Sequence, residues 1–196
     1  MKRKQNIILA SQSERRADLL RQIGIDFTII PSEFDENSIS KTHVDPKEYV
    51  QTLAFKKAEF LSCQGIDNQI ILGADTVVVI EGHILGKPQN PQQAYEYLNL
   101  LSGKEHQVYT GVCIIDQVRA KKMVCSQVTT VVMDTMNEHD FDEYISTKEP
   151  FDKAGAYGIQ GIGARYIKEI HGDYFNIVGL PLNLTVHMFK QMQIDL

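Results

Sequence analysis

The apolar residues of this chain fall into short runs and helical stripes that alternate along its length. Runs rich in Ile and Val predict strands over residues 7–10, 27–30, 69–80, 84–85, 108–115 and 123–133. Apolar residues three and four apart predict helices over 14–24, 46–61, 91–102, 138–145 and 182–189. Residues 165–170 and 175–178 resemble a last hairpin with its turn at 171–173. Interleaved strands and helices with an antiparallel portion indicate an α/β or mixed α+β fold.

The central run, residues 70–80, contains a single charged residue, Asp75. A continuous apolar run is typical of a strand buried on both faces, and a carboxylate there is costly unless it is paired or hydrogen-bonded. Asp75 is therefore a candidate functional acid at the end of an apolar strand. The alternative is structural, with Asp75 capping a turn between two strands and accepting backbone N–H groups.

Two arginines, Arg15 and Arg16, fall in the first turn of a helix that Ser13 is placed to cap and Gly24 to end. Helix N-termini favour anions, so two cations there are unfavourable for an isolated helix. They are explained if a polyanion binds to the helix N–H groups and both guanidinium groups. The alternative is a solvated surface pair.

Further candidates lie in the segments around this core. On the next helix Lys56 and Lys57 lie near the edge of the apolar face, where one of them could be only a snorkelling stem. Three acids, Glu33, Asp35 and Glu36, could hold Mg²⁺ or Mn²⁺, or could form a solvated acidic loop. A lysine also stands on a constrained loop at Gly86-Lys87-Pro88, and residues 155–163 contain four glycines.

Composition restricts the class of protein. The 196 residues are 43% hydrophobic and 23% charged, which is typical of one globular domain of two lobes. A net charge of -5 argues against nucleic-acid binding and anionic membranes. Three scattered cysteines favour a reducing cytoplasm. The basic residues 2–4 precede only four apolar residues, too few for a signal-peptide core, and no run reaches the length of a membrane span.

The candidate residues together match a divalent-metal site that handles a polyphosphate. Hydrolysis of a phosphoanhydride requires charge neutralisation on the phosphates, a metal and an activated water. The candidate cations are Arg15, Arg16, Lys57 and Lys87, and the candidate acids are Asp35, Glu36 and Asp75. The six histidines show no zinc-type spacing, and no serine or cysteine motif indicates a protein nucleophile.

Seven motifs in order resemble the Maf family of nucleoside triphosphate pyrophosphatases, also called septum-formation inhibitor proteins. They span nearly the whole chain and lie at residues 8–20, 53–58, 73–78, 85–88, 101–106, 152–161 and 172–181. One departure is Glu14, where the family usually has proline, which should affect the rigidity of the helix start and not the chemistry.

The resemblance implies an elongated two-lobed fold like that of the inosine triphosphate pyrophosphatases, with a central mixed sheet flanked by helices and a cleft between lobes. It implies a homodimer, as in many members, that depends on a divalent cation, Mg²⁺ or Mn²⁺, and cleaves a nucleoside triphosphate between its α- and β-phosphates. Asp75 would be the general base, with Glu36 and Asp75 as metal ligands. Residue chemistry alone does not decide whether Asp75 acts as the general base or as a metal ligand. Substrate would be bound by Ser11, Arg15, Arg16, Lys57 and Lys87.

Within the family, this chain resembles the dTTP/UTP group. The residues that carry this assignment are Arg15, Arg16, Thr76 and Gln160, and the chain has no Trp, which the 7-methyl-GTP group typically carries beside the arginine. Gln160 could pair with the base edge, or it could merely tie the Gly-rich segment to its neighbours. Two other functions remain open: a regulatory nucleotide-binding protein that inhibits cell division, and a house-cleaning pyrophosphatase for modified or purine nucleotides.

Overall fold

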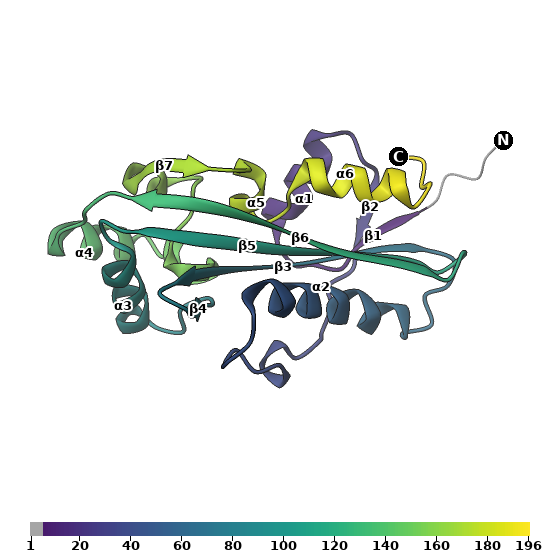
Figure 1. Ribbon diagram of the computed structural model, residues 1–196, viewed down its shortest axis with the longest axis horizontal. Coiled ribbons are helices and arrows are strands. Elements are labelled where there is room, and N and C mark those ends of the chain that lie inside the picture. The colour runs from purple at the N-terminus through teal and green to yellow at the C-terminus, as the bar shows by residue number, and fades with distance from the viewer. Residues whose placement is uncertain (1–5) are drawn as a thin grey trace. The chain divides into compact units, whose positions relative to one another are not determined.

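The computed structural model describes residues 6–196 and has the expected α/β class (Figure 1). The basic residues 2–4 lie outside the described part. Seven strands form one sheet: β1 (Ile7–Leu9), β2 (Phe27–Ile29), β3 (Ile70–Ile80), β4 (His83–Leu85), β5 (Glu105–Asp116), β6 (Lys121–Met133) and β7 (Ile167–His171). The helices are α1 (Glu14–Gln22), α2 (Pro46–Ser62), α3 (Pro91–Leu101), α4 (Glu138–Ser146), α5 (Tyr174–Val178) and α6 (Leu182–Gln191). No helix within residues 6–196 is long and apolar enough to span a bilayer.

The sheet is mixed and has the strand order β2-β1-β3-β5-β6-β7, with β4 paired to β3. Strand β1 is parallel to both β2 and β3, whereas β4 is antiparallel to β3 and β7 is antiparallel to β6. The antiparallel β3–β4 pair follows from the turn at Glu81-Gly82, where both residues have positive φ.

Side-chain caps begin three of the predicted helices, α2, α3 and α4. The Asp45 side chain accepts from the N–H of Glu48 at 3.1 Å, and the Asn90 side chain accepts from the N–H of Gln93 at 2.8 Å. Asn137 forms a capping box at the start of α4. Each cap satisfies N–H groups that the first helical turn cannot pair internally.

The expected C-terminal hairpin is wrong. Strand β7 is present, but residues 174–178 form helix α5 instead of a returning strand. The Asp173 carboxylate accepts from the N–H of Phe175 at 2.8 Å and starts this turn of helix. Asn176 is buried, and its amide donates to the Val108 carbonyl at 2.9 Å and to the Thr129 hydroxyl at 3.0 Å. These contacts override the strand propensity of Phe, Ile and Val.

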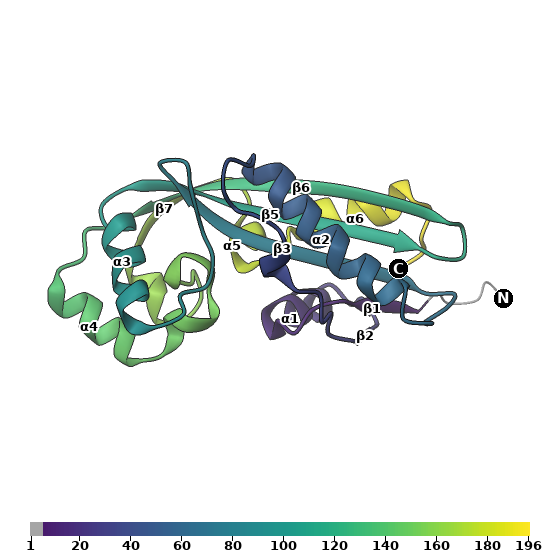
Figure 2. The same cartoon turned by 90° about the horizontal axis from the view of Figure 1, so that it is seen from below.

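The chain divides into two compact units. The first consists of residues 6–75, 110–127 and 179–196, and the second of 76–109 and 128–178. In the first unit, α2 lies on one side of the strands and α6 on the other (Figures 1 and 2). Its α2-facing core contains Ile8, Ala10, Ala54, Ala58, Leu61, Ile71 and Cys113. In the second unit, α3 and α4 pack together over a core that includes Val78, Leu98, Val108, Val131, Phe141, Tyr144 and Tyr157.

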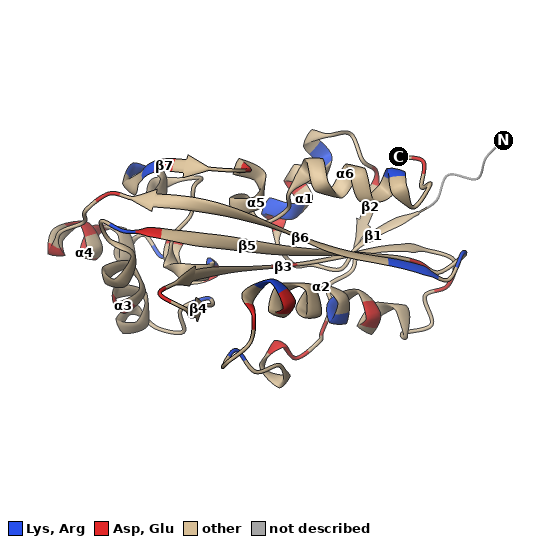
Figure 3. Ribbon diagram, viewed as in Figure 1, with Lys and Arg blue, Asp and Glu red and all other residues tan. Residues whose placement is uncertain are grey.

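Helix α2 approaches the sheet closely at two glycines. A Cβ atom on Gly73 of β3 would collide with the Ala54 carbonyl, and one on Gly111 of β5 would collide with the Val50 carbonyl. Glycine at both positions lets the helix backbone rest directly on the strands. Helix α2 carries both acidic and basic residues (Figure 3), so this close packing also brings its charged residues towards β3.

Candidate active site

Asp75 lies in the middle of strand β3, and the expectation that it ends a strand is wrong. The strand continues to Ile80, and its last three residues, Val78–Ile80, pair with β4. Asp75 is only 6% exposed and sits among apolar neighbours. The alternative that it caps a turn is therefore excluded, and its carboxylate must be stabilised by another group.

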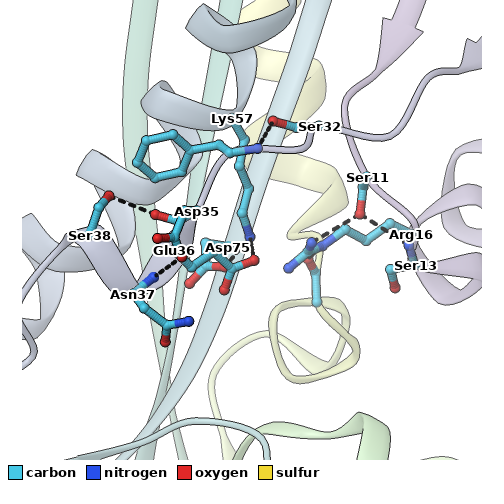
Figure 4. Close-up of polar contacts among 12 residues, drawn as sticks. Ser11, Ser13, Arg16, Ser32, Asp35, Glu36, Asn37, Ser38, Lys57 and Asp75 are labelled. Atoms are coloured by element: carbon cyan, nitrogen blue, oxygen red, sulfur yellow. Dashed lines mark hydrogen bonds and ion pairs between the residues drawn. The ribbon is translucent and has the colours of Figure 1, made fainter.

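That group is Lys57 of α2. Its Nζ donates to Asp75 Oδ1 at 2.6 Å and contacts Glu36 Oε1 at 2.7 Å, so one ammonium bridges two carboxylates (Figure 4). The Lys57 and Asp75 side chains are buried, whereas that of Glu36 is half exposed. We call Lys57, Asp75 and Glu36 the lysine-centred site. Lys57 is thus not a snorkelling stem, and its neighbour Lys56 pairs near the surface with Glu59.

The geometry of this site follows from the close approach of α2 to β3. Asp75 lies two residues beyond Gly73 and so on the same face of the strand. Lys57 lies three residues beyond Ala54, one turn further along the same face of the helix. The contact between Gly73 and Ala54 therefore sets the separation across which the lysine reaches the carboxylate.

Negative charge at this site affects a neighbouring tyrosine. Burial, together with the negative charges of Asp75 and Glu36, raises the pKa of Tyr49 to about 12. Tyr49 belongs to α2 and is fully buried. Its phenol stays protonated at neutral pH, so it adds no charge to the site.

The predicted acidic cluster is only partly assembled. Asp35 caps a short 3-10 helix, η1 (Glu36–Ser38), by accepting from the N–H of Asn37 at 3.0 Å, while Glu36 alone among the three acids contacts Lys57 (Figure 4). Within residues 6–196 no group of three or more His, Cys, Asp or Glu side chains could hold a metal ion. A divalent ion held by one or two carboxylates and by substrate phosphates requires fewer protein ligands. Asp75 and Glu36 fit that mode, because both already contact one positive charge.

The arginines of α1 differ in environment. Arg16 is 9% exposed; its Nε donates to the Gly179 carbonyl at 2.8 Å, and its Nη1 donates to the hydroxyl of buried Ser11 at 3.2 Å. Burial lowers the pKa of Arg16, and the charge of Asp75 acts in the opposite direction. Arg15 is half-buried. Ser13 stands at the N-cap as expected, but its side chain makes no cap hydrogen bond.

The remaining predicted site residues belong to the second unit. Thr76 follows Asp75 on β3, and Lys87 is an exposed residue beyond β4. The carbonyl of Gly86 accepts a hydrogen bond from the N–H of Gly155 at 3.0 Å. This bond joins the loop that carries Lys87 to the Gly-rich segment, residues 155–163. A Cβ on Gly155 would lie 2.8 Å from Val78 of β3, and its φ is +68°, so only glycine fits there.

Gln160 is exposed, and its side chain makes no hydrogen bond within the described residues. Tyr144 and Glu149 hold the surrounding segment instead, and the sequence analysis missed both. Tyr144 belongs to an apolar helical stripe, and Glu149 is a lone acid before proline. No sequence signal identifies them, because their partners are backbone N–H groups 13 and 14 residues away.

Comparison with known proteins places these residues in a family. The model of the family described as Maf-like protein matches residues 6–192. A protein of Clostridium novyi (strain NT) named dTTP/UTP pyrophosphatase is 45% identical over 190 residues, which cover 97% of this chain and 99% of the relative. A Bacillus anthracis protein of the same name is 46% identical over 189 residues, covering 96% of each chain.

A solved structure shares the fold at low sequence identity. The Staphylococcus aureus Ham1 protein superposes with a TM-score of 0.53 and 15% identity, covering 96% of this chain and 100% of that one. Likeness at this level concerns the fold alone. The family model, by contrast, covers nearly all of the described residues, and the chain belongs to the Maf-like protein family.

Proposed function

We propose that this protein is a nucleotide diphosphatase that hydrolyses dTTP and UTP to the nucleoside monophosphate and pyrophosphate. The observation that carries the proposal is the buried Asp75 carboxylate held by Lys57 in the middle of β3. Such a pair is costly to bury and is a weak source of stability, so a functional role explains it better than a structural one. Relatives covering nearly the whole chain carry the name dTTP/UTP pyrophosphatase.

In the proposed mechanism Asp75 is the general base that takes a proton from the attacking water. Lys57 keeps the carboxylate oriented through the hydrogen bond from its Nζ to Asp75 Oδ1. Arg15, at the start of α1, would bind phosphate with its planar guanidinium. Arg16 would act beside it while its own hydrogen bonds hold Ser11 and Gly179 in place.

The substrate-binding set also includes Ser11, Thr76, Lys57, Lys87 and Gln160, as the family resemblance implies. The lysines would act as point charges on the phosphates.

The proposal includes a divalent cation, Mg²⁺ or Mn²⁺, with Glu36 and Asp75 as its protein ligands. Such an ion supplies charge neutralisation on the phosphate oxygens. Glu36 is half exposed and is the first residue of η1, and this exposure supports an exchange of one cationic partner for another. The proposal further includes a cytoplasmic location, which the scattered cysteines favour. It also includes a homodimer, as the resemblance implies, and size-exclusion chromatography with light scattering tests the dimer.

The deciding experiment is pyrophosphate release from a panel of triphosphates with Mg²⁺ or Mn²⁺. Turnover of dTTP and UTP above CTP, ITP and 7-methyl-GTP supports the proposal. Faster turnover of ITP or of modified nucleotides would instead favour a house-cleaning role. Nucleotide binding without turnover of any triphosphate would favour a regulatory role in septum formation and would contradict the enzyme.

We expect Arg15→Ala to lower kcat/KM for dTTP by roughly 10–100-fold, the value of one charge-assisted hydrogen-bonding group. Arg15→Lys should restore this only in part, because lysine lacks the planar bidentate donor. The matched control is Arg21→Ala on the same helix, since Arg21 is exposed and contacts the surface acids Glu14 and Asp18 and the ring of Phe27. Unchanged KM and kcat in Arg15→Ala would show that the phosphates bind elsewhere.

Gln160 is proposed to set base preference together with Arg15 and Thr76. Uracil and thymine present an N3–H donor flanked by carbonyl acceptors, and a glutamine amide can meet that edge with one acceptor and one donor. Its exposed amide makes no hydrogen bond to residues 6–196, which leaves both groups available for a ligand.

We expect Gln160→Glu to lower kcat/KM for dTTP and UTP by about tenfold or more, because sites built on hydrogen bonds discriminate strongly when one is lost. Relative preference should move towards bases that offer donors, such as 7-methylguanine. The measurement is kcat/KM across dTTP, UTP, CTP and 7-methyl-GTP with a thermal melt, and exposed Gln64→Glu is the charge-matched control. An unchanged preference order in a folded variant would contradict the role.

A further inference from the structure

The residue proposed to read the base lies between two short 3-10 helices, η3 (Ala154–Ala156) and η4 (Ile162–Tyr166). Gln160 stands between Gly158 and Gly161, and Gly161 has a φ of +80°. A segment of this composition loses much conformational entropy when it is ordered, so defined contacts must hold it. The side chain of Gln160 provides none of them within the described residues.

One side of the segment is held by a carboxylate. Glu149 Oε2 accepts from the N–H of Ile162 at 2.9 Å, and Glu149 Oε1 accepts from the N–H of Gly163 at 3.1 Å. These two N–H groups follow Gln160 by two and three residues. A Cβ on Gly161 would lie 2.7 Å from Glu149 Oε2, so the glycine is what lets the carboxylate approach the backbone.

The other side of the segment is held by a phenol. Tyr144 is fully buried in α4; its hydroxyl donates to Glu149 Oε1 at 3.0 Å and accepts from the N–H of Gly158 at 3.3 Å. The hydroxyl thus uses both its donor and its acceptor capacity. Tyr144 and Glu149, which we call the clamp, hold the backbone two residues before Gln160 and two and three residues after it.

The clamp requires an ionised carboxylate. Both oxygens of Glu149 accept hydrogen bonds, and a neutral carboxyl group would place a donor against one of these N–H groups. Burial raises the pKa of Glu149, but the N–H groups of Ile162 and Gly163 and the Tyr144 hydroxyl outweigh burial and lower the pKa below its ordinary value. Burial in turn raises the pKa of Tyr144, so the phenol remains a donor.

We propose that Tyr144 and Glu149 are positioning residues that fix the Gln160 backbone and thereby determine the preference for dTTP and UTP. This inference rests on the proposed function of Gln160. The clamp touches no substrate; it acts only through the segment that it holds. A misplacement of about 1 Å at a positioned group can cost up to about 100-fold in rate, so a loose segment should weaken recognition of the base.

The test is Tyr144→Phe, which removes the hydroxyl and keeps the buried ring. We expect the ratio of kcat/KM for dTTP to that for CTP to fall by about tenfold, chiefly through a higher KM for dTTP, because uniform binding of the base is lost. Glu149→Gln should act in the same direction, because the NH₂ group of the substituted side chain would face a backbone N–H. The matched controls are Tyr95→Phe and Glu138→Gln, which remove the same kind of hydrogen bond at 2.8 Å from an exposed pair.

A double variant distinguishes positioning from simple stability. If the clamp acts through Gln160, the effects of Tyr144→Phe and Gln160→Ala on the dTTP/CTP ratio will not add. A lower melting temperature with an unchanged ratio in both clamp variants would overturn the inference. A shifted ratio in Gln160→Ala alone would leave the proposed function standing and refute the clamp. Absence of turnover by the wild-type protein would refute the proposed function, and the clamp would fall with it.

Discussion

Asp75→Asn is expected to lower kcat/KM for dTTP and UTP by about 10²–10⁴-fold, the usual contribution of a positioned general base. An asparagine amide has nearly the same shape as the carboxylate but cannot accept the proton of the attacking water. The loss should appear mainly in kcat, because proton transfer belongs to the chemical step. Steady-state pyrophosphate release with dTTP measures it.

The control for this variant is a second buried acid of the same unit. Asp116 is fully buried and pairs with Arg119 at 2.8 Å, yet it lies at the end of β5, outside the lysine-centred site. Asp116→Asn should lower the melting temperature while leaving kcat nearly unchanged. Near-normal turnover in a folded Asp75→Asn protein would show that Asp75 is not the base.

Gly73→Ala is expected to reduce both stability and turnover, although the residue touches no substrate. The new methyl group would collide with the Ala54 carbonyl, so α2 must move away from β3. Overpacking of this kind costs about 1–3 kcal/mol. The shift would also draw Lys57 Nζ away from Asp75, which it contacts at 2.6 Å. Thermal unfolding and kcat, measured on the same preparation, test both parts.

Gly111→Ala provides the comparison. Its methyl group would meet the Val50 carbonyl, on the same helix but about two turns before Lys57. The two variants should therefore lose similar stability, but Gly73→Ala should lose more activity. Equal losses of kcat in both would mean that the distance between Lys57 and Asp75 does not limit the reaction.

Local patterns predicted most of the fold because most of its elements are determined locally. The apolar run of β3 and the caps at Asp45, Asn90 and Asn137 each depend on a few adjacent residues. Helix α5 was missed because contacts with Val108 and Thr129, far away in the chain, hold Asn176 inside. Where a distant partner decides the local structure, propensity alone fails.

In the candidate site, too, local sequence predicted the residues but not their contacts with distant partners. The motifs identified Asp75 and Lys57, and a cluster of acids identified Glu36, but only the fold reveals that one ammonium joins the two carboxylates. The central position of Asp75 within β3 could not be read from an apolar run, which looks the same on either side of the acid. Arg16 was predicted beside Arg15 at the start of α1, and sequence spacing could not show that two of its donor groups bind Ser11 and Gly179.

Lys57 is a counter-ion for Asp75 that belongs to the protein itself. The buried charge of Asp75 is compensated by a cation tethered to the same chain, so the folded state does not depend on a dissolved ion for that neutralisation. A tethered group competes at a high effective concentration against anything that arrives from solution. Under the proposed function, a divalent cation that binds Asp75 and Glu36 would have to displace the ammonium, and the substrate phosphates would offer the ammonium a new partner.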